Sequence, residues 1–397
     1  MQIGLLQESR LAEVKITTRQ IFCGQWLYTG STTGATMRAR REEPAKPAWS
    51  SDQLDSPSPP EIEAPYFDDL LGAWVLSRYS DVLAAFRSSS LSPIGPNSKA
   101  TSEPPDKSSL LKMREETREA LSPIQLRSWR ECMTPLVDSL ADNLPTSKPI
   151  DLVAKYARPS CLALAAMVTG IDLHDAERLE KIAEPISASA AEPYDPILRS
   201  SAKSAKVELR GCFHPGPEFL RDSGFVALVH TLPRLLASVW FALLQHPQQW
   251  SILHQEPGLT EQAIEELLRY AGLPRILFRR ATKDINLNGF HIRKGERIIL
   301  RIIAANRDPE RFVNPDRVDV VRGGTGQLTL GAGPHSCVGA NLIRMAAVTI
   351  SRPLLEQFAR VKLAETVEWQ GGSGFRSPVS LVVSLEREPV SPYHPDS

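Results

Sequence analysis

The chain has 397 residues, enough for one large domain or two ordinary ones, and its 42% hydrophobic and 23% charged residues are typical of a soluble globular protein. Lysine plus arginine and aspartate plus glutamate number 46 each, so a formal net charge of zero gives no electrostatic reason to expect nucleic acid or an anionic membrane as a partner. The five cysteines are an odd number spread thinly, which argues against a disulfide framework and favours a reducing, cytoplasmic compartment.

The first part of the chain, residues 1–59, is expected to be a flexible N-terminal extension. A basic cluster at 38–41 is followed at once by two glutamates, as in a solvated linker, and the proline-rich run at 56–65 comes next. Charged residues within the first fifteen positions interrupt the apolar core that a signal peptide needs. The folded domain is therefore expected over residues 60–397.

From residue 60 onward the pattern predicts a mostly helical domain with a small β region. Helices are expected at 110–120, 125–142, 150–170, 224–244, 247–254 and 260–270, with Gly170 ending the third of them. The segment 174–220 is polar and broken by prolines. Short β-like runs follow Pro274, and the pair Asn288-Gly289 predicts a tight turn between two of them.

The apolar stretch 224–244 could be taken for a membrane span. His230, Pro233 and Arg234 lie near its middle, and a charged group at a bilayer centre costs about 3 kcal/mol on insertion scales. We therefore expect a buried central helix and no membrane insertion.

The clearest motif is LGAGPHSCVG, which runs from Leu330 to Gly339 into an apolar stretch. Its glycines, Gly331, Gly333 and Gly339, permit unusual backbone conformations and the close approach of a flat ligand. Cys337 stands just before a predicted helix, where the helix dipole and free N–H groups favour a thiolate. A thiolate in this position is an electron-donating ligand for haem iron and favours O–O cleavage.

Other interpretations of Cys337 exist at this point. A lone buried cysteine is usually a small hydrophobic side chain. His335 and Cys337 could form half of a zinc site, but no second Cys/His pair lies at ligand spacing. The glycines do not match a dinucleotide-binding fingerprint, because its sixth position is Ser336 here.

Over roughly residues 60–397 the sequence resembles the cytochrome P450 family. Three motifs occur in order: E-x-x-R at 266–269, a meander-like segment at 306–320 (NRDPERFVNPDRVDV), and the cysteine loop F-x-x-G-x-H-x-C-x-G with Leu330 in place of phenylalanine. The resemblance implies a mainly α single-domain P450 fold with a small β region. It is a triangular helical prism that holds haem b (iron protoporphyrin IX) between the central long helix and the cysteine-loop helix. It also implies that Cys337 ligates the iron, while Leu330 leaves the tuning of the thiolate open.

The E-x-x-R motif places Glu266 and Arg269 on one helical face. On a surface such a pair would contribute only a few tenths of a kcal/mol. In the family it is buried and completed by an arginine that precedes the cysteine loop. Arg311 and Arg317 are candidates, and Arg317, twenty residues before Cys337, has the spacing of bacterial members.

The resemblance also assigns the residues that anchor the haem. Arg279 in FRRATKD matches an arginine that pairs with a propionate, and His335 matches a second propionate donor. Arg114 matches a third, with Arg118 as its rival, while Leu110 replaces a histidine often found four residues earlier. The arginine fork suits this role because it can hold a carboxylate bidentately.

The central helix departs from the family's A-G-x-D/E-T motif, because the equivalent residues are ALVHT at 227–231. Thr231 is kept, His230 replaces the acid and Leu228 replaces the glycine. Three interpretations follow: His230 relays protons as an acid or base, the enzyme uses peroxide or a substrate-assisted route, or the reaction is not an oxygenation. Arg234, one turn further on, is expected to depress the pKa of the histidine.

Two further expectations concern the distal side. Pro233 cannot donate a hydrogen bond to the carbonyl of residue 229, so the helix should be distorted beside Thr231. The segment 174–220 looks shorter than the family's usual substrate lid. The candidate pocket residues are mostly apolar, which suggests an apolar or mid-sized substrate; they are Ala227, Leu228, Thr231, Leu277 and Phe375.

The resemblance thus implies a cytoplasmic haem-thiolate monooxygenase of secondary metabolism, with Cys337 on iron and Thr231 and His230 handling distal protons. A ferredoxin or flavoprotein would supply electrons, the chain would act as a monomer, and no nucleic acid would be involved. Two alternatives remain: a peroxide-driven or non-oxygenating haem-thiolate enzyme, and a catalytically degenerate haem-binding partner protein.

Overall fold

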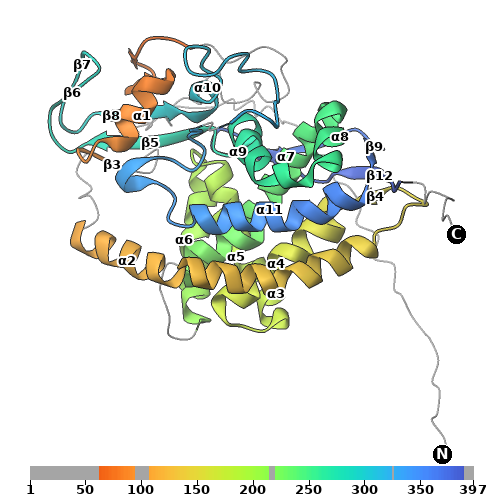
Figure 1. The fold of residues 1–397 in the computed structure, drawn as a ribbon. Coiled ribbons are helices and arrows are strands. Elements are labelled where there is room, and N and C mark those ends of the chain that lie inside the picture. Colours follow the sequence, from red (N-terminus) through yellow and green to blue (C-terminus); the bar gives the residue numbers. More distant parts are fainter. Residues whose placement is uncertain (1–61, 94–106, 214–219, 324–325, 389–397) are drawn as a thin grey trace, which may run out of the picture. The chain divides into compact units, whose positions relative to one another are not determined.

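A mostly helical body and a smaller β region make up the computed structural model of the protein (Figure 1). The model describes residues 62–93, 107–213, 220–323 and 326–388. These residues all belong to one compact unit, Pro44–Ser397. The predicted extension 1–59 lies outside the described residues, so its boundary stays a prediction.

The helices agree with the predicted helical class. The α-helices are α1 (Tyr79–Arg87), α2 (Lys107–Ala120), α3 (Pro123–Asp142), α4 (Arg158–Thr169), α5 (Leu173–Ala191), α6 (Pro196–Gly211), α7 (Leu232–Gln245), α8 (Pro247–Gln255), α9 (Thr260–Ala271), α10 (Ile302–Ala305) and α11 (Ala340–Gln357). Short π-helical turns are η2 (Val153–Ala157), η3 (Leu220–Gly224) and η4 (Ala227–Thr231), and short 3₁₀ turns are η5 (Pro257–Leu259) and η6 (Gly333–His335).

Local signals in the sequence explain several helix ends. Ser122 accepts a hydrogen bond from the Gln125 amide at the start of α3, where Pro123 takes the first helical position. Gly170 ends α4 in the left-handed conformation, at φ 71°, which confirms the predicted stop. These caps fix the lengths of the helices that surround the central one.

The β region is built on a five-stranded sheet in the order β1-β2-β8-β5-β3, in which only β2 and β8 are parallel. Its strands are β1 (Tyr66–Asp68), β2 (Ala73–Leu76), β3 (Leu91–Pro93), β5 (Ile276–Ala281) and β8 (Arg297–Arg301). The remaining strands are β4 (Ile150–Asp151), β6 (Ile285–Leu287), β7 (Phe290–Ile292), β9 (Arg360–Leu363), β10 (Trp369–Gly371), β11 (Arg376–Pro378) and β12 (Val382–Glu386). Asn288 and Gly289 both have positive φ between β6 and β7, so the predicted tight turn is confirmed.

The central helix accounts for the most apolar stretch of the chain. The span Ala227–Gln245 is long and apolar enough to cross a membrane, but two thirds of its most apolar window is buried inside the protein. Trp240 is fully buried here, and its Nε1 donates to Ser351 Oγ of α11 at 2.9 Å. The apolarity of the segment therefore serves the core, as predicted.

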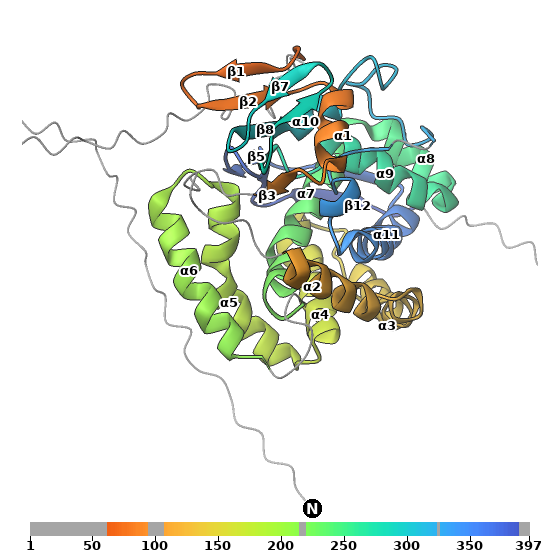
Figure 2. The same cartoon turned by 90° about the vertical axis from the view of Figure 1, so that its left-hand side faces the viewer.

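The proline-broken segment 174–220 forms two long helices, α5 and α6, and α5 continues through Pro185. These helices form a hairpin, called here the α5–α6 hairpin, which lies at one side of the helical body (Figure 2). The prolines therefore break this segment less than the sequence suggested. Asp172 and Asp195 cap the two helices, which offsets the poor helix propensity of the segment.

Candidate functional site

The cysteine motif forms a tight loop between η6 and the first turn of α11. The Cys337 amide donates to the Leu330 carbonyl at 2.8 Å, and the Ala340 amide donates to the Cys337 carbonyl at 3.2 Å. Gly333 has a φ of 67°, and a Cβ atom at this position would lie 2.8 Å from the carbonyl oxygen of Phe86 in α1. Only glycine satisfies both conditions, so the sequence itself determines how closely the loop packs on α1.

The other members of the motif divide into two groups. Gly331 also has a positive φ, of 70°, whereas Gly339 has an ordinary φ of −86° and serves as the N-cap of α11. Leu330 is buried in the main hydrophobic core, and His335 is half-buried in η6. The predicted need for glycine therefore holds at Gly331 and Gly333, and not for backbone reasons at Gly339.

The charges around Cys337 act on its thiol in opposite directions. Burial raises the pKa of the Cys337 thiol above its usual value, while the Gly339 amide and the guanidinium groups of Arg114 and Arg344 lower it. Net, the pKa is raised, so the helix start alone does not produce the thiolate that the sequence suggested. Binding to a metal cation would supply the missing stabilisation, because a coordinating thiol is deprotonated.

Arg114, in α2, reaches the cysteine loop directly. Its Nη2 donates to the carbonyl of Ser336 at 3.0 Å. Arg118, its predicted rival, is exposed and pairs with Glu115 on the same helix. The structure therefore places Arg114, and not Arg118, beside Cys337.

Arg279, in β5, is buried, and no carboxylate of the described residues pairs with it. Its side chain stacks on the ring of Phe86, with Cζ 5.4 Å from the ring centroid, and donates to the carbonyl of Phe278 at 2.8 Å. The residue is 5% exposed, its Nε has no hydrogen-bond partner in the described part of the chain, and burial lowers its pKa to about 10. A buried cation with so few partners calls for an anionic ligand.

Glu266 and Arg269 of α9 form a fully buried bidentate pair. Both N–O distances are 2.8 Å, and both side chains are 0% exposed. Arg269 also donates to the carbonyls of Asn306 and Pro315. The pair therefore ties α9 to the meander that leads to the cysteine loop.

The prediction that Arg317 is the third member of this cluster is wrong. The side chain of Arg317 is exposed, and only its carbonyl takes part, accepting from Arg269 at 3.2 Å. Arg322 completes the cluster, with Nε 3.2 Å from Glu266 Oε1. The reason is the turn between them: the Arg322 amide donates to the Asp319 carbonyl, which brings the later arginine back over α9. Spacing from the cysteine could not reveal that turn.

The distal segment of the central helix is distorted where the sequence predicts it. Ala227–Thr231 is a π-helical turn, and the amide of Leu232 donates to the carbonyl of Ala227, five residues back. Pro233 follows in the first turn of α7 and has no N–H for the carbonyl of Val229. Such a wide turn is common at functional sites.

His230 does not lie free in this turn. Its Nε2 is 2.9 Å from the carbonyl oxygen of Glu180 in α5. Burial, and secondarily Arg234, lower the pKa of His230, although the Glu180 carbonyl and nearby carboxylates oppose that shift. Sequence reasoning missed Glu180, because nothing in the polar segment 174–220 marks it.

The predicted pocket residues come from three parts of the fold. Ala227, Leu228 and Thr231 belong to η4, and Leu228 is 3% exposed. Leu277 lies in β5, opposite Leu300 of β8. Phe375 precedes β11 and pairs with residue 274 in an isolated bridge. The fold thus places the η4 turn, β5 and the C-terminal turn within one compact unit.

Comparison with known proteins agrees with this geometry. A family model described as Cytochrome P450 matches residues 249–368, which include the E-x-x-R helix and the cysteine loop. Nocardicin C N-oxygenase of Nocardia uniformis subsp. tsuyamanensis is 28% identical over 374 residues, covering 81% of this chain and 91% of its own. The biotin biosynthesis cytochrome P450 of Bacillus subtilis is 27% identical and covers 67% of this chain and 75% of its own. P450BioI, solved in complex with acyl carrier protein carrying hexadec-9Z-enoic acid, shares the fold with a TM-score of 0.73 at 24% identity, over 81% of this chain and 95% of its own.

The chain belongs to the cytochrome P450 family. It is accordingly an oxidoreductase, and the family implies a haem cofactor.

The residues of this P450 fit a haem. The buried guanidinium of Arg279, whose Nε has no partner in the part of the chain that the structure describes, suits a propionate, and Arg114 adds a second cation beside the loop. The Cys337 Sγ is the soft ligand that iron requires, and a Cβ at Gly339 would lie 3.9 Å from it. The donor set and the orphaned buried cation together match the charges of an iron porphyrin.

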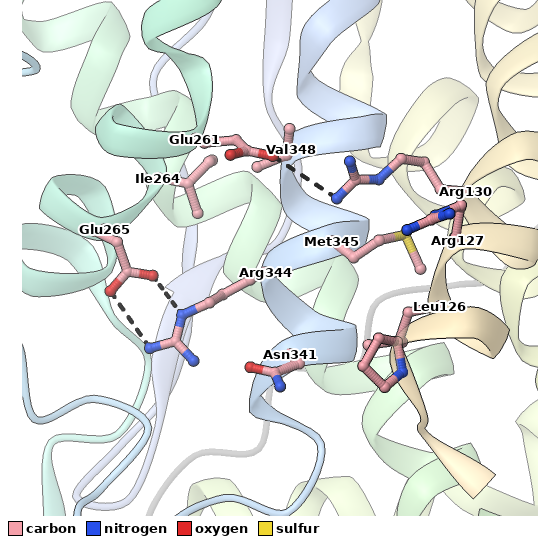
Figure 3. Close-up of a pocket in the computed structure, with 11 residues that line it drawn as sticks. Leu126, Arg127, Arg130, Glu261, Ile264, Glu265, Asn341, Arg344, Met345 and Val348 are labelled. Carbon is pink, nitrogen blue, oxygen red and sulfur yellow. Dashed lines mark hydrogen bonds and ion pairs between the residues drawn. The ribbon is translucent and has the colours of Figure 1, made fainter.

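A groove lies between α3, α9 and α11 (Figure 3). Its volume is about 530 Å³, and apolar side chains of three helices line it together with charged ones. Arg344 pairs there with Glu265 at 2.5 Å, and Arg130 approaches Glu261 at 3.7 Å. Arg127 also borders the groove and is exposed.

Proposed function

We propose that this P450 is a haem-thiolate monooxygenase of biosynthetic metabolism, which inserts one oxygen atom from O₂ into an apolar or mid-sized organic substrate. The other oxygen atom of O₂ is reduced to water, which takes up two protons and two electrons from a ferredoxin or flavoprotein. One observation carries the proposal: Cys337 lies just before α11 and beside Arg114, while the buried cation Arg279 has no carboxylate partner within the described ranges. The named relatives, an N-oxygenase and a biotin biosynthesis P450, support the reaction class and the biosynthetic setting.

Each residue has a distinct part in this proposal. Cys337 would ligate the iron of haem b, which supplies the oxygen-activating chemistry when bound. Arg279, His335 and Arg114 would hold the propionates, and the buried cluster of Glu266, Arg269 and Arg322 would keep the meander and the loop in register.

Thr231 would donate its hydroxyl proton on the distal side, because it matches the threonine of the family's central-helix motif and is half-buried in η4. Ala227, Leu228, Leu277 and Phe375 would line the substrate pocket. Leu228 would restrict access over the porphyrin, because it puts a bulky side chain where the family has glycine.

A labelling experiment tests the reaction. A substrate that shifts the haem spectrum is turned over with ¹⁸O₂ and a reductase system, and the mass of the product is measured by mass spectrometry. Incorporation of one ¹⁸O atom supports the monooxygenase. Product without label, or no product from any spectrally active substrate, contradicts it.

The contact of His230 favours a second candidate, a peroxide-driven oxygenation. No acid occupies position 230, and the Nε2 proton of the imidazole is committed to a carbonyl of α5. Hydrogen peroxide brings its own protons and electrons, so that substrate and peroxide give hydroxylated product and water. Label from H₂¹⁸O₂, together with turnover that needs no reductase, would establish this route.

We further propose that the electron donor docks over the groove of Figure 3. Arg344 lies close enough to Cys337 to lower the pKa of its thiol, so the groove borders the electron entry side. Arg127 and Arg130 would attract an acidic partner. The variants Arg127→Glu and Arg130→Glu should slow reductase-driven turnover most at low ionic strength and leave peroxide-driven turnover unchanged; equal effects on both would refute the assignment.

A further inference from the structure

His230 makes a contact that a proton relay does not need. Its Nε2 lies 2.9 Å from the carbonyl oxygen of Glu180, fifty residues earlier in the chain. A carbonyl can only accept, so Nε2 must carry the proton and donate it. In the neutral imidazole that is the one ring proton, which is then held by α5 and is not directed at a distal ligand.

Glu180 is itself fixed from the other side. Its carboxylate is 8% exposed and pairs bidentately with Arg158 of α4, at 2.7 Å from Nε and 2.5 Å from Nη2. Pro185 removes the hydrogen bond that the next carbonyl of α5, that of Lys181, would receive within the helix. This turn of α5 therefore lacks one helical hydrogen bond, and contacts from Arg158 of α4 and His230 of η4 hold it in place.

The tip of the α5–α6 hairpin has a second attachment. The Ala191 carbonyl accepts from the Gly374 amide at 3.0 Å, and Tyr194 packs edge-on against Phe278 of β5, with 5.7 Å between ring centroids. The tip therefore rests on the C-terminal turn and on β5, the two segments that carry Phe375 and Leu277. The hairpin spans from the η4 turn to these segments.

We propose that His230 is a positioning residue that latches the α5–α6 hairpin onto the central helix. This inference rests on the proposed function in one respect: η4 carries the proposed pocket residues, so a hairpin that is latched to η4 would govern the access of organic ligands to the haem. The latch is a side-chain hydrogen bond at the middle of α5, and the tip contacts act as the second point of attachment. Loss of the latch frees the hairpin to pivot on its tip.

The groups that face His230 agree with a neutral latch. Arg234 lies one turn further along the central helix, Glu180 and Glu184 face it from α5, and Arg158 neutralises the carboxylate of Glu180. Burial is the first cause of the lowered pKa of His230. The geometry carries the assignment, and the charges are compatible with it.

Two variants separate the latch from mere packing. His230→Gln keeps an N–H donor at a similar reach, and His230→Leu keeps much of the volume without a donor. In the holoenzyme, amide hydrogen exchange over residues 176–191 should rise about fivefold in His230→Leu, as expected for one hydrogen bond, and less than twofold in His230→Gln. Exchange in α3 serves as the internal reference. Equal exchange in wild type and His230→Leu, or equal increases in both variants, would overturn the proposal.

Ligand entry gives a second readout. Association of a bulky azole should be accelerated in His230→Leu, whereas association of carbon monoxide should change much less because it needs little opening. The variant Glu180→Gln keeps the backbone carbonyl, so it should retain slow azole entry even though it weakens the Arg158 pair. If azole and carbon monoxide respond alike, the hairpin does not gate entry through this bond.

If His230→Leu fails to fold, the wild-type protein still decides the matter. ¹⁵N NMR of the imidazole at neutral pH should show the Nε2–H tautomer with Nδ1 unprotonated. An Nδ1–H tautomer with Nε2 unprotonated would overturn the latch. Failure of the proposed function is distinguishable, since it would appear as the absence of thiolate-ligated haem with the exchange results unaffected.

Discussion

Arg322 and Arg317 offer a direct contrast between a contact that the structure contains and one that sequence spacing suggested. We consider Arg322→Met and Arg317→Met, which remove the charge and keep most of the aliphatic stem. Arg322 is 15% exposed in its side chain and donates to Glu266 at 3.2 Å and to the carbonyl of Val313 at 2.7 Å. Arg317 has an exposed side chain and contributes a backbone carbonyl that methionine retains.

The magnitude follows from what remains after each change. Removing the whole partner of a buried carboxylate would cost about 3–5 kcal/mol, but Glu266 keeps both bonds to Arg269 and accepts from the Asp319 amide at 3.0 Å. The loss for Arg322→Met is then one charged hydrogen bond of about 1.5–3 kcal/mol, plus about 1 kcal/mol for the carbonyl contact. Arg317→Met, at an exposed position, should stay within about 0.5 kcal/mol.

Urea unfolding of the two holoproteins measures the difference in unfolding free energy. We expect Arg322→Met to be destabilised by about 2.5–4 kcal/mol and Arg317→Met to be nearly neutral. Because unfolding of a haem protein can depart from two states, loss of the haem absorbance and loss of helical circular dichroism are followed together. Equal destabilisation, or a larger effect at Arg317, would refute the assignment of the third arginine.

Three further predictions concern the loop, the buried cation and pH. Gly333→Ala should destabilise the protein by about 1–3 kcal/mol or more and weaken haem retention. Gly339→Ala should perturb the backbone less, because Gly333 combines a positive φ with a backbone clash and Gly339 does not. Similar shifts of the melting temperature in the two variants would contradict this. Arg279→Met should raise the unfolding free energy of the haem-free protein, because it removes a buried charge that lacks a carboxylate partner among the described residues, and it should weaken haem binding. A lower unfolding free energy in both the haem-free and the haem-bound protein would show that Arg279 is satisfied without the cofactor. Because the pKa of His230 is lowered in the folded state, the unfolded state takes up a proton first as the pH falls, so unfolding free energy should decrease below the ordinary histidine pKa of about 6.5 by at most about 1.4 kcal/mol per pH unit from this group. His230→Gln should remove that part of the pH dependence, and an unchanged profile measured by urea unfolding would contradict the direction of the shift.

Much of the fold follows from local signals that the sequence carries openly. Gly170 ends a helix because it adopts the left-handed conformation, and Asn288-Gly289 turns a hairpin for the same reason. The apolar run of the central helix predicts burial, and Trp240 shows it. These elements need only neighbouring residues to specify them.

The segments that the sequence described poorly depend on contacts between distant residues. α5 runs through Pro185 because its cap and its packing outweigh one lost hydrogen bond, which no local pattern reveals. Arg322 takes the place expected for Arg317 because a turn at Asp319 brings it back over α9. His230 was expected to serve proton transfer, yet its partner lies on α5, in a segment without a recognisable motif.

The site residues meet at the cysteine loop through contacts that the sequence does not reveal. Arg114 donates to the carbonyl of Ser336 in the loop, and the buried Arg279 stacks on Phe86, against which the loop packs; the family implies the haem that these charges suit. Thr231 and the apolar pocket residues stay predictions, since their function depends on the substrate. Their positions in η4, β5 and the C-terminal turn make each of them accessible to substitution.

The most direct test of the central claim is the spectrum of the reduced protein with carbon monoxide, recorded for wild type and Cys337→Ser. The account predicts the red-shifted Soret band of thiolate-ligated haem in the wild type and its loss in the variant, with the fold retained by circular dichroism. A wild-type spectrum without that band, or the same band in Cys337→Ser, would contradict the assignment of Cys337 as the iron ligand.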